Sequence, residues 1–379
     1  MQAILAVILG CFAAASPIRD DERVLFYPTY ATYDQAAATW TLRVHAIVFE
    51  PEESSLRRRA MIKLISHFAK LKPEEESSEI FRERIRPFLY DNERGKDPVV
   101  EVRQQRVRLP ETGSNGHAET SIRLELKATA SPKTFTLRTK ARDGRVFAGK
   151  VHAIQPKGLS VISDIDDTIK ISQVMIRKEL ARNTFVRPFK AVPGTATIYR
   201  ELAKQGAAFH YVSGSPWQLY EPLEQFLAKA DFPAGTFHLR NFRLKDRTAG
   251  ALFQPAEKHK LVAIRRLLRD FPERRFLLIG DSGEQDPEIY CQIAREHPKQ
   301  IACIFIRTVT DPSTEAARYA KLVEIGTEGK SSSKLRPDVF HTFQNADELR
   351  KSIKEVLKLA SSRTTGNKKP VARDRANVK

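Results

Sequence analysis

Two aspartates, Asp164 and Asp166, closely follow a short apolar run that ends at Ile162. Residues two apart in an extended chain project on the same side of it. Two carboxylates about 4 Å apart repel by roughly 4 kcal/mol at an effective dielectric constant near 20, unless a cation or a proton lies between them. The pair therefore predicts a metal ion at the carboxyl end of a buried parallel strand, where open α/β sheets bind ligands. One of the two carboxylates is then free to act as a nucleophile.

Three further apolar runs also end in polar residues, namely Ser213, Asp281 and Arg307. Amphipathic segments at 196–204 and 260–270 separate these runs, and alternation of short strands with helices is typical of a parallel sheet. The four predicted strands cover 159–162, 209–212, 276–279 and 301–306. The sequence therefore predicts an α/β fold, a domain built on a Rossmann-like parallel sheet with its polar side chains gathered at one edge.

These strand ends supply the groups that hydrolysis of a phosphate monoester needs: a nucleophile, a proton donor and a source of positive charge. We expect Asp164 to attack phosphorus and form an aspartyl-phosphate. Asp166 is expected to protonate the leaving alkoxide and then to activate water for the second step. Asp281 is expected to bind Mg²⁺ together with Asp164 and a backbone carbonyl, because Mg²⁺ prefers oxygen ligands.

Other polar residues are assigned to the phosphate or to its surroundings. Ser213 is expected to donate a hydrogen bond to a phosphoryl oxygen, and either Lys258 or Lys260 to neutralise charge. Asp286 is expected to orient a metal ligand, although an acid at this position could also serve a helix N-terminus through the helix dipole.

The motifs, taken in this order, resemble those of the haloacid-dehalogenase phosphatase superfamily. They are more similar still to the phosphatidate phosphatase family first known from an actin-patch protein, whose catalytic domain is related to the lipin-type domain. The similar segments are SDIDDTIK at 163–170, YVSGSPWQLY at 211–220, FPERRF at 271–276, LIGDSGEQDPEIY at 278–290 and the pair Ile306-Arg307. Early segments at 24–30 and 48–51 also look like that family.

The resemblance implies Mg²⁺-dependent removal of phosphate from phosphatidate to give diacylglycerol. It selects Lys260 rather than Lys258 as the motif lysine, and it places Ser213, Gly214, Lys260 and Arg307 at the substrate. The metal ligands that it implies are Asp164, Asp166 and Asp281. Gly214 departs from the family pattern, in which asparagine is often found, and this difference could alter a substrate contact. Asp167 is expected to have a structural role.

Two other functions fit the same motifs. One is a non-catalytic phosphatidate-binding module, as in related lipid-transfer proteins that have lost the acids, and the other is a phosphatase for soluble phosphomonoesters. Because binding alone requires no proton donor, the presence of both Asp164 and Asp166 favours catalysis.

The segment between the first two motifs mixes basic and apolar residues, and we expect it to form a face that contacts an anionic membrane surface. Its members are Arg177, Lys178, Arg182, Arg187 and Lys190, interleaved with Val174, Met175, Ile176, Phe185, Val186 and Phe189.

The chain of 379 residues is long enough for two domains, and its net charge of +18 indicates an anionic partner. The phosphatase motifs favour a phosphorylated substrate or a membrane surface, and no nucleic acid is expected. Three regions are predicted. Residues 20–155 form a β-rich, antiparallel N-terminal domain that contains a helical insertion, residues 156–360 form a catalytic domain, and residues 361–379 form a basic disordered tail.

Residues 1–15 resemble a secretory signal peptide, with an apolar segment that is too short to span a bilayer and small residues before Ser16. A lipoprotein signal ending at Cys11 is a weaker alternative. This segment predicts a secreted, periplasmic or cell-envelope protein, or a cytoplasmic one if it is not cleaved. Cys291 and Cys303 would then remain, and they could form one disulfide.

Overall fold

The computed structural model describes residues 17–51, 55–125, 133–242, 257–324, 335–336 and 338–365. The predicted signal peptide at 1–15 lies outside this part of the chain. Helix α10 (Ala346–Thr365) continues into the first residues of the predicted tail, and 366–379 lie outside the described residues. Within the described part, no helix has the length and apolar character needed to cross a membrane.

A six-stranded parallel sheet forms the catalytic region, as the sequence predicts. Its order is β12 (Thr236–Arg240), β11 (Ala208–Pro216), β10 (Gly158–Ser163), β13 (Arg274–Asp281), β14 (Ile301–Arg307) and β15 (Phe340–Phe343). The four predicted strands are β10, β11, β13 and β14. The two edge strands β12 and β15 were not predicted, because their short sequences, TFHLR and FHTF, have no continuous apolar run.

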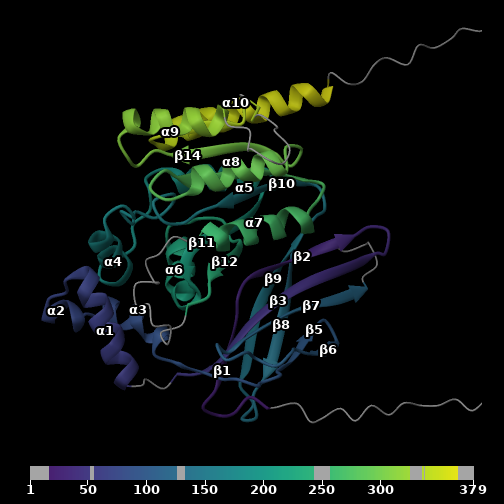
Figure 1. The fold of residues 1–379 in the computed structure, drawn as a ribbon. Coiled ribbons are helices and arrows are strands. Elements are labelled where there is room, and N and C mark those ends of the chain that lie inside the picture. Colours follow the sequence, from purple (N-terminus) through teal and green to yellow (C-terminus); the bar gives the residue numbers. More distant parts are fainter. Residues whose placement is uncertain are drawn as a thin grey trace, which may run out of the picture.

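Helices cover both faces of this sheet (Figure 1). Val161 and Ile162 are adjacent in β10 but belong to different apolar cores, as the alternation of a strand requires. One core receives α5 (Thr195–Lys204), α6 (Tyr220–Lys229) and α10, and the other receives α7 (Glu257–Asp270) and α8 (Asp286–Glu296). Helix α9 (Pro312–Glu324) packs beside α8. Cys291 and Cys303 are free and buried, so the disulfide considered above is not formed.

The order of the strands creates a switch point at β10. The chain passes from β10 to β11 and then β12 on one side, and α7 returns it to β13 on the other side of β10. Connections that diverge in this way leave a crevice at the carboxyl ends of the strands, where open α/β sheets bind ligands. Asp164 follows β10 at this point.

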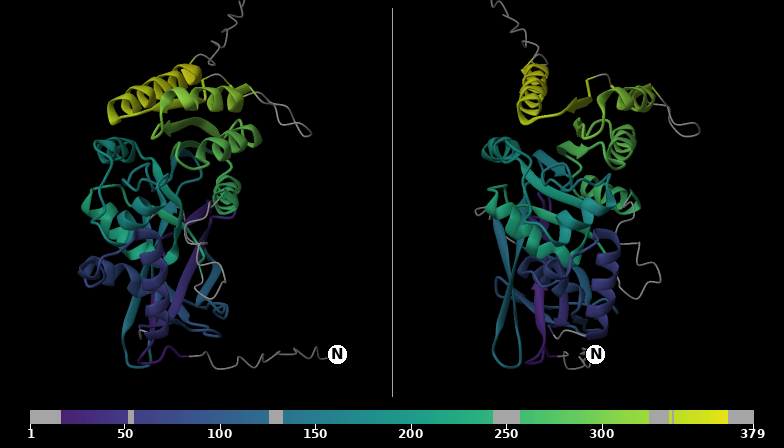
Figure 2. Two further views of the ribbon diagram at one scale, coloured as in Figure 1. Left: turned by 60° about the vertical axis from the view of Figure 1, so that its left-hand side comes forward. Right: turned by 90° about the vertical axis from the view of Figure 1, so that its left-hand side faces the viewer.

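A nine-stranded sheet precedes the catalytic region, in agreement with the prediction of a β-rich N-terminal region (Figure 2). Its strands are β1 (Arg23–Phe26), β2 (Thr29–Asp34), β3 (Thr39–Glu50), β4 (Asp91–Asn92), β5 (Val99–Val102), β6 (Gln105–Arg108), β7 (His117–Glu125), β8 (Thr134–Lys140) and β9 (Val146–Ile154). The pairing is antiparallel except between β2 and β9, which are parallel.

The helical insertion of the N-terminal region packs against the catalytic region rather than against its own sheet. It contains α1 (Ser55–Ala69), α2 (Pro73–Glu76) and α3 (Glu79–Ile85), and α1 lies against α4 (Arg177–Phe185), as Figure 1 shows. Met61 and Phe81 share an apolar core with Phe185. The insertion therefore supports the segment that follows the first motif.

Candidate active site

Lys260 lies at the centre of a buried cluster of carboxylates. Its side chain is 2% exposed, and its Nζ is 2.9 Å from Asp164 Oδ1, 2.6 Å from Asp286 Oδ1 and 3.1 Å from Glu284 Oε2. Burial alone would lower the pKa of Lys260, but the neighbouring carboxylates outweigh it and raise the pKa above its usual value. Lys258, by contrast, is exposed. The structure therefore places Lys260, and not Lys258, beside the predicted nucleophile.

Asp281 has an oxygen that nothing in the described chain satisfies. It is fully buried, and its Oδ2 accepts a hydrogen bond of 2.6 Å from the Gly283 N–H. Its Oδ1 has no hydrogen-bond partner among the described residues. A buried polar atom without a partner is costly, and a cation bound to this oxygen would remove the cost.

Asp164, Asp281 and Asp286 each offer an oxygen, and these three oxygens lie within 4.8 Å of one another. Burial raises the pKa of all three carboxyl groups, and repulsion from neighbouring carboxylates, including Glu284, adds to the shift although Lys260 opposes it. Three carboxylates and one ammonium carry two excess negative charges, and Glu284 beside Lys260 adds a third, so a divalent cation would offset most of the excess. The three aspartates therefore fit a Mg²⁺ ion.

The sequence analysis named Asp166 among the metal ligands, with a backbone carbonyl in the site, and gave Asp286 the role of orienting a ligand. In the structure the three carboxylates that lie close enough to share an ion are those of Asp164, Asp281 and Asp286. The physical reason is that the carboxylate of Asp166 is engaged elsewhere. Asp286 begins α8, so it returns its side chain to the end of β13, where its Oδ2 is 3.4 Å from the Asp281 N atom.

Asp166 is held by an ammonium and by hydroxyl groups. Its Oδ1 is 2.6 Å from Lys170 Nζ and accepts a 2.6 Å hydrogen bond from Ser172 Oγ. Its Oδ2 accepts hydrogen bonds from Ser213 Oγ at 3.3 Å and Ser215 Oγ at 3.0 Å. Burial raises the pKa of Asp166, but these partners outweigh burial and lower the pKa to about 2. In this arrangement Asp166 is an ionised carboxylate that can accept a proton.

A small cleft of about 50 Å³ opens beside Asp166. Gly214, Ser215 and Glu284 provide its polar wall, which includes the predicted contact Gly214. Its apolar wall comes from α4 and the neighbouring loops, through Val174, Leu180, Phe185, Pro216 and Leu219. The cleft therefore has polar residues beside Asp166 and an apolar wall from α4 and the neighbouring loops.

Asp167 and Arg307 hold the backbone of the first motif. The Asp167 carboxylate accepts hydrogen bonds from the backbone N–H groups of Ser172 (2.8 Å), Gln173 (2.9 Å) and Val174 (2.7 Å). This is the structural role that the sequence predicts. The Nη1 of Arg307 donates to the Asp167 carbonyl at 2.6 Å. Arg307 is thus engaged with the motif itself through Nη1, and the substrate contact expected of it stays a prediction.

Sequence reasoning missed several supporting residues. Lys170 and Ser215 carried detectable signals, because Lys170 follows Asp166 by four residues and Ser215 lies two residues beyond Ser213 on the same strand. Arg318 of α9 had no such signal in the sequence. Its guanidinium donates to the carbonyls of Ser282 and Glu284, both at 2.8 Å, and so holds the loop that carries the second half of the cluster.

Comparison with known proteins bears directly on this site. Residues 159–308, which include every residue of the cluster, match the family described as phosphatidate phosphatase APP1, catalytic domain. This part of the chain is similar to the APP1 catalytic domain. The match confirms the family to which the motifs pointed.

Two fungal relatives support the assignment. Phosphatidate phosphatase APP1 of Saccharomyces cerevisiae is 28% identical over 256 residues, which cover 64% of this chain and 43% of the relative. An uncharacterized protein of Schizosaccharomyces pombe is 32% identical over 169 residues, which cover 44% of this chain and 27% of the relative. The chain thus spans less than half the length of each of these relatives.

A solved structure described as a carbohydrate esterase aligns over 91% of this chain and 98% of its own, with 9% identity. Its TM-score of 0.22 is too low to indicate a shared fold.

Proposed function

We propose that this chain is a Mg²⁺-dependent phosphatidate phosphatase that releases phosphate and diacylglycerol through an aspartyl-phosphate intermediate. The observation that carries the proposal is the buried pair of Asp164 and Lys260, 2.9 Å apart, inside the segment that matches the APP1 catalytic domain. Hydrolysis of phosphate monoesters is among the slowest uncatalysed reactions, so the site must both position a nucleophile and balance charge.

In the first step an Asp164 carboxylate oxygen attacks phosphorus, and the bond from phosphorus to the glycerol oxygen breaks. Lys260 faces the attacking carboxylate and balances negative charge as the phosphoryl group transfers, while Ser213 donates to a phosphoryl oxygen. Asp164, Asp281 and Asp286 would hold Mg²⁺, which supplies further positive charge for the phosphoryl oxygens.

The contacts of Asp166 suggest how protons move. Asp166 is ionised, so the proton for the leaving alkoxide comes from Lys170, whose Nζ is 2.6 Å from Asp166 Oδ1. Asp166 passes this proton to the alkoxide and Lys170 becomes neutral. In the second step water attacks the aspartyl-phosphate, Asp166 accepts the proton of that water, and the proton returns to Lys170. Both groups then regain their original charges.

The proposal is tested by phosphate release from phosphatidate vesicles and from a panel of soluble phosphomonoesters, each with Mg²⁺ and with EDTA. We expect turnover that requires Mg²⁺, prefers phosphatidate and is abolished by Asp164→Asn. Asp143→Asn, at an exposed aspartate between β8 and β9, is the matched control and should retain full activity.

The alternatives give different results in the same assay. Binding of phosphatidate without phosphate release would indicate a non-catalytic module. Preference for soluble monoesters would indicate a different substrate class, and activity in Asp164→Asn would refute the assignment of the nucleophile.

Phosphatidate as a substrate requires contact with a membrane. We propose that this contact involves only part of the basic and apolar segment identified in the sequence. Phe185 is buried, Arg182 pairs with Glu75, and Arg187 Nη1 is 2.6 Å from Glu179 Oε2. Phe185 and Arg182 therefore serve the fold, whereas the Arg187 side chain is paired but 40% exposed.

The remaining part of the segment is an exposed tip next to the cleft. Ile171 is 36% exposed, Met175 61% and Ile176 54%. Arg177 and Lys178, also exposed, directly follow them. Apolar side chains flanked by basic ones suit insertion into an anionic bilayer surface, and Val174 of the same tip lines the cleft.

Replacement of Met175 and Ile176 together by serine tests this contact. We expect vesicle binding and phosphatidate turnover to fall by at least about tenfold, because burying two such side chains contributes roughly 1.5–3 kcal/mol each. Hydrolysis of a soluble monoester should not change. Val146→Ser removes an equally exposed apolar side chain (58%) from β9 and should have no effect. Equal activity of the wild-type protein on vesicles and on soluble monoesters would argue against a membrane contact.

A further inference from the structure

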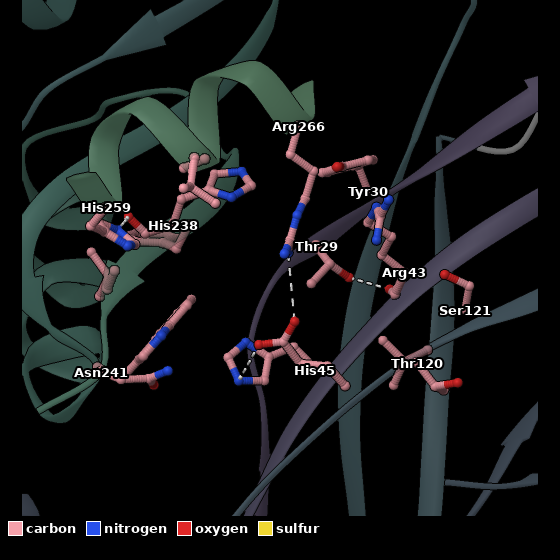
Figure 3. Close-up of a pocket in the computed structure, with 17 residues that line it drawn as sticks. Thr29, Tyr30, Arg43, His45, Thr120, Ser121, His238, Asn241, His259 and Arg266 are labelled. Atoms are coloured by element: carbon pink, nitrogen blue, oxygen red, sulfur yellow. Dashed lines mark hydrogen bonds and ion pairs between the residues drawn. The ribbon is translucent and has the colours of Figure 1, made fainter. Parts of the chain in front are cut away.

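A second, larger cavity of about 390 Å³ lies between the β-rich sheet and the catalytic region. Figure 3 shows its walls, with Arg43 and His45 from β3 on one side and His238, His259 and Arg266 from β12 and α7 on the other. None of the aspartates of the catalytic cluster lines it. Helix α7 separates the two sites, because His259 lines the cavity while its neighbour Lys260 points into the cluster.

Two arginines line the cavity, and each pairs with an acid: Arg43 Nη2 is 2.6 Å from Asp270 Oδ2, and Arg266 pairs with Glu119. Arg266 reaches across it from α7 to Glu119 of β7, with a long ion-pair distance of 3.6 Å between side chains that are 40% and 53% exposed (Figure 3). Such a loose, exposed pair is easily exchanged for another anion. Glu119 is also the one acidic residue among those that line the cavity.

The positive charge of Arg266 also acts on two buried histidines that line the cavity, His45 and His238. Burial, and then the positive charge of Arg266, lowers the pKa of His45 to about 3. Burial lowers the pKa of His238 to about 3 as well, with contributions from His259 and Arg266. Both rings are therefore neutral near pH 7, so an entering anion would meet the positive charge of Arg266 and the negative charge of Glu119.

The walls also offer an aromatic surface and hydroxyl groups. Tyr30, Trp217 and Phe237 line the cavity, as do the hydroxyl groups of Thr120 and Ser121. A volume of about 390 Å³ lies in the range of sites for small organic molecules, roughly 300–1,000 Å³, and is more than a bare phosphate ion would fill.

We propose that this cavity binds a small phosphorylated organic molecule. Its phosphate pairs with Arg266 in place of Glu119, and its organic part lies against Trp217 and Phe237. A guanidinium group matches phosphate in bidentate geometry, and a phosphate has enough oxygens to accept hydrogen bonds from Thr120 or Ser121 at the same time. This site is separate from the catalytic cluster, and the proposal does not depend on the function proposed above.

Phenylphosphonate is a suitable probe, because it combines a dianion with an aromatic ring and its carbon–phosphorus bond is not a phosphoester. The chain has two tryptophans. Trp217 lines the cavity and Trp40 lies in the core of the β-rich sheet, so fluorescence can report occupancy. The full chain is titrated in EDTA, without turnover. We expect a saturable change, and weaker binding of benzoate, which has a single negative charge.

Two variants remove the site by different means. Arg266→Gln removes the positive charge, and Val262→Glu places a negative charge at the rim, on a side chain that is 58% exposed and should tolerate it. Both should weaken binding of phenylphosphonate by at least about tenfold. Ser213→Ala in the catalytic cleft and Val146→Glu, also 58% exposed but on β9, should leave binding unchanged.

Several results would overturn the proposal. They are the absence of a saturable signal in the wild-type protein, equal or tighter binding of benzoate, and binding that is lost in Ser213→Ala but kept in Arg266→Gln. The last result would place the probe in the catalytic cleft. Since the titration involves no catalysis, its failure would leave the proposed phosphatase activity unaffected.

Discussion

Replacement of Asp281 by asparagine should stabilise the metal-free protein and abolish Mg²⁺-dependent turnover. Asp281 is fully buried, and its Oδ1 has no hydrogen-bond partner in the described chain. Burial, followed by repulsion from Asp286 and Asp164, raises the pKa of its carboxyl group well above the usual value. Without a cation, the native state is therefore destabilised by this charge or takes up a proton.

The size of the effect can be worked out from the distances. Oxygens of Asp164, Asp281 and Asp286 lie within 4.8 Å of one another. At this separation two unit charges repel by about 3.5 kcal/mol for an effective dielectric constant of 20. Protonating an ordinary aspartate at pH 7 costs about 4 kcal/mol, and this cost sets an upper limit to the penalty. Asparagine removes the charge and still accepts from the Gly283 N–H, so we expect a gain of about 1–3 kcal/mol in the free energy of unfolding.

Urea unfolding followed by circular dichroism, in EDTA and then with saturating Mg²⁺, measures this difference. In EDTA the variant should be more stable than the wild type, and Mg²⁺ should stabilise only the wild type. Phosphate release by the variant should be absent under both conditions.

Asp167→Asn is a matched control that should change the free energy of unfolding in the opposite direction. Asp167 is also buried, but its carboxylate accepts from three backbone N–H groups, so asparagine should cost about 1–3 kcal/mol. If Asp281→Asn lost stability in EDTA as Asp167→Asn does, the reasoning about uncompensated charge would be refuted.

Three further predictions follow from single contacts. His45 has a pKa of about 3 in the folded protein, below its unfolded value of 6.5, so stability should fall by about 1.4 kcal/mol per pH unit as pH drops below 6.5. Urea midpoints should show this fall, and His45→Asn should reduce it. In Gly280→Ala the new Cβ would overlap Asp286 Oδ2, so the free energy of unfolding should fall by about 1–3 kcal/mol and the Mg²⁺ requirement should rise. Arg318→Lys cannot hold both loop carbonyls, and Mg²⁺ titration of phosphate release should show about 10–100-fold weaker affinity with little change in melting temperature.

The sequence predicted the parts of the fold that depend on local pattern. The four central strands contain the short apolar runs seen in the sequence. Asp281 and Arg307 end β13 and β14 and Asp164 follows β10 as expected, whereas Ser213 lies within β11, which continues to Pro216. The edge strands β12 and β15 were not predicted, because hydrogen-bond pairing with one neighbouring strand, rather than their composition, makes them strands. The packing of α1 on α4 was not predicted for a related reason. Contacts between residues more than a hundred positions apart leave no local pattern in the sequence.

The candidate site shows the same division. Spacing identified which carboxylates meet at the strand ends, but it could not say which of them share an ion. The partners of Asp166 and Asp286 decide which of these two carboxylates lies beside Asp164 and Asp281. Lys170 and three hydroxyl groups bind the Asp166 carboxylate, while Lys260 draws Asp286 towards Asp164. Only the folded structure shows how these two lysines are distributed.

That distribution also divides the chemistry between two lysines. Lys260 balances the carboxylates that face the phosphoryl group, and Lys170 sits behind the carboxylate that must move a proton. If they act in this way, their variants should fail differently. Lys260→Met should impair substrate and Mg²⁺ binding together with turnover. Lys170→Met should retain Mg²⁺ binding but slow turnover, most strongly for substrates with basic leaving groups such as alkyl phosphates. Aryl phosphates, whose leaving oxygens need no proton, should be hydrolysed at nearly the wild-type rate, and equal slowing of both substrate types would rule out a proton relay through Lys170.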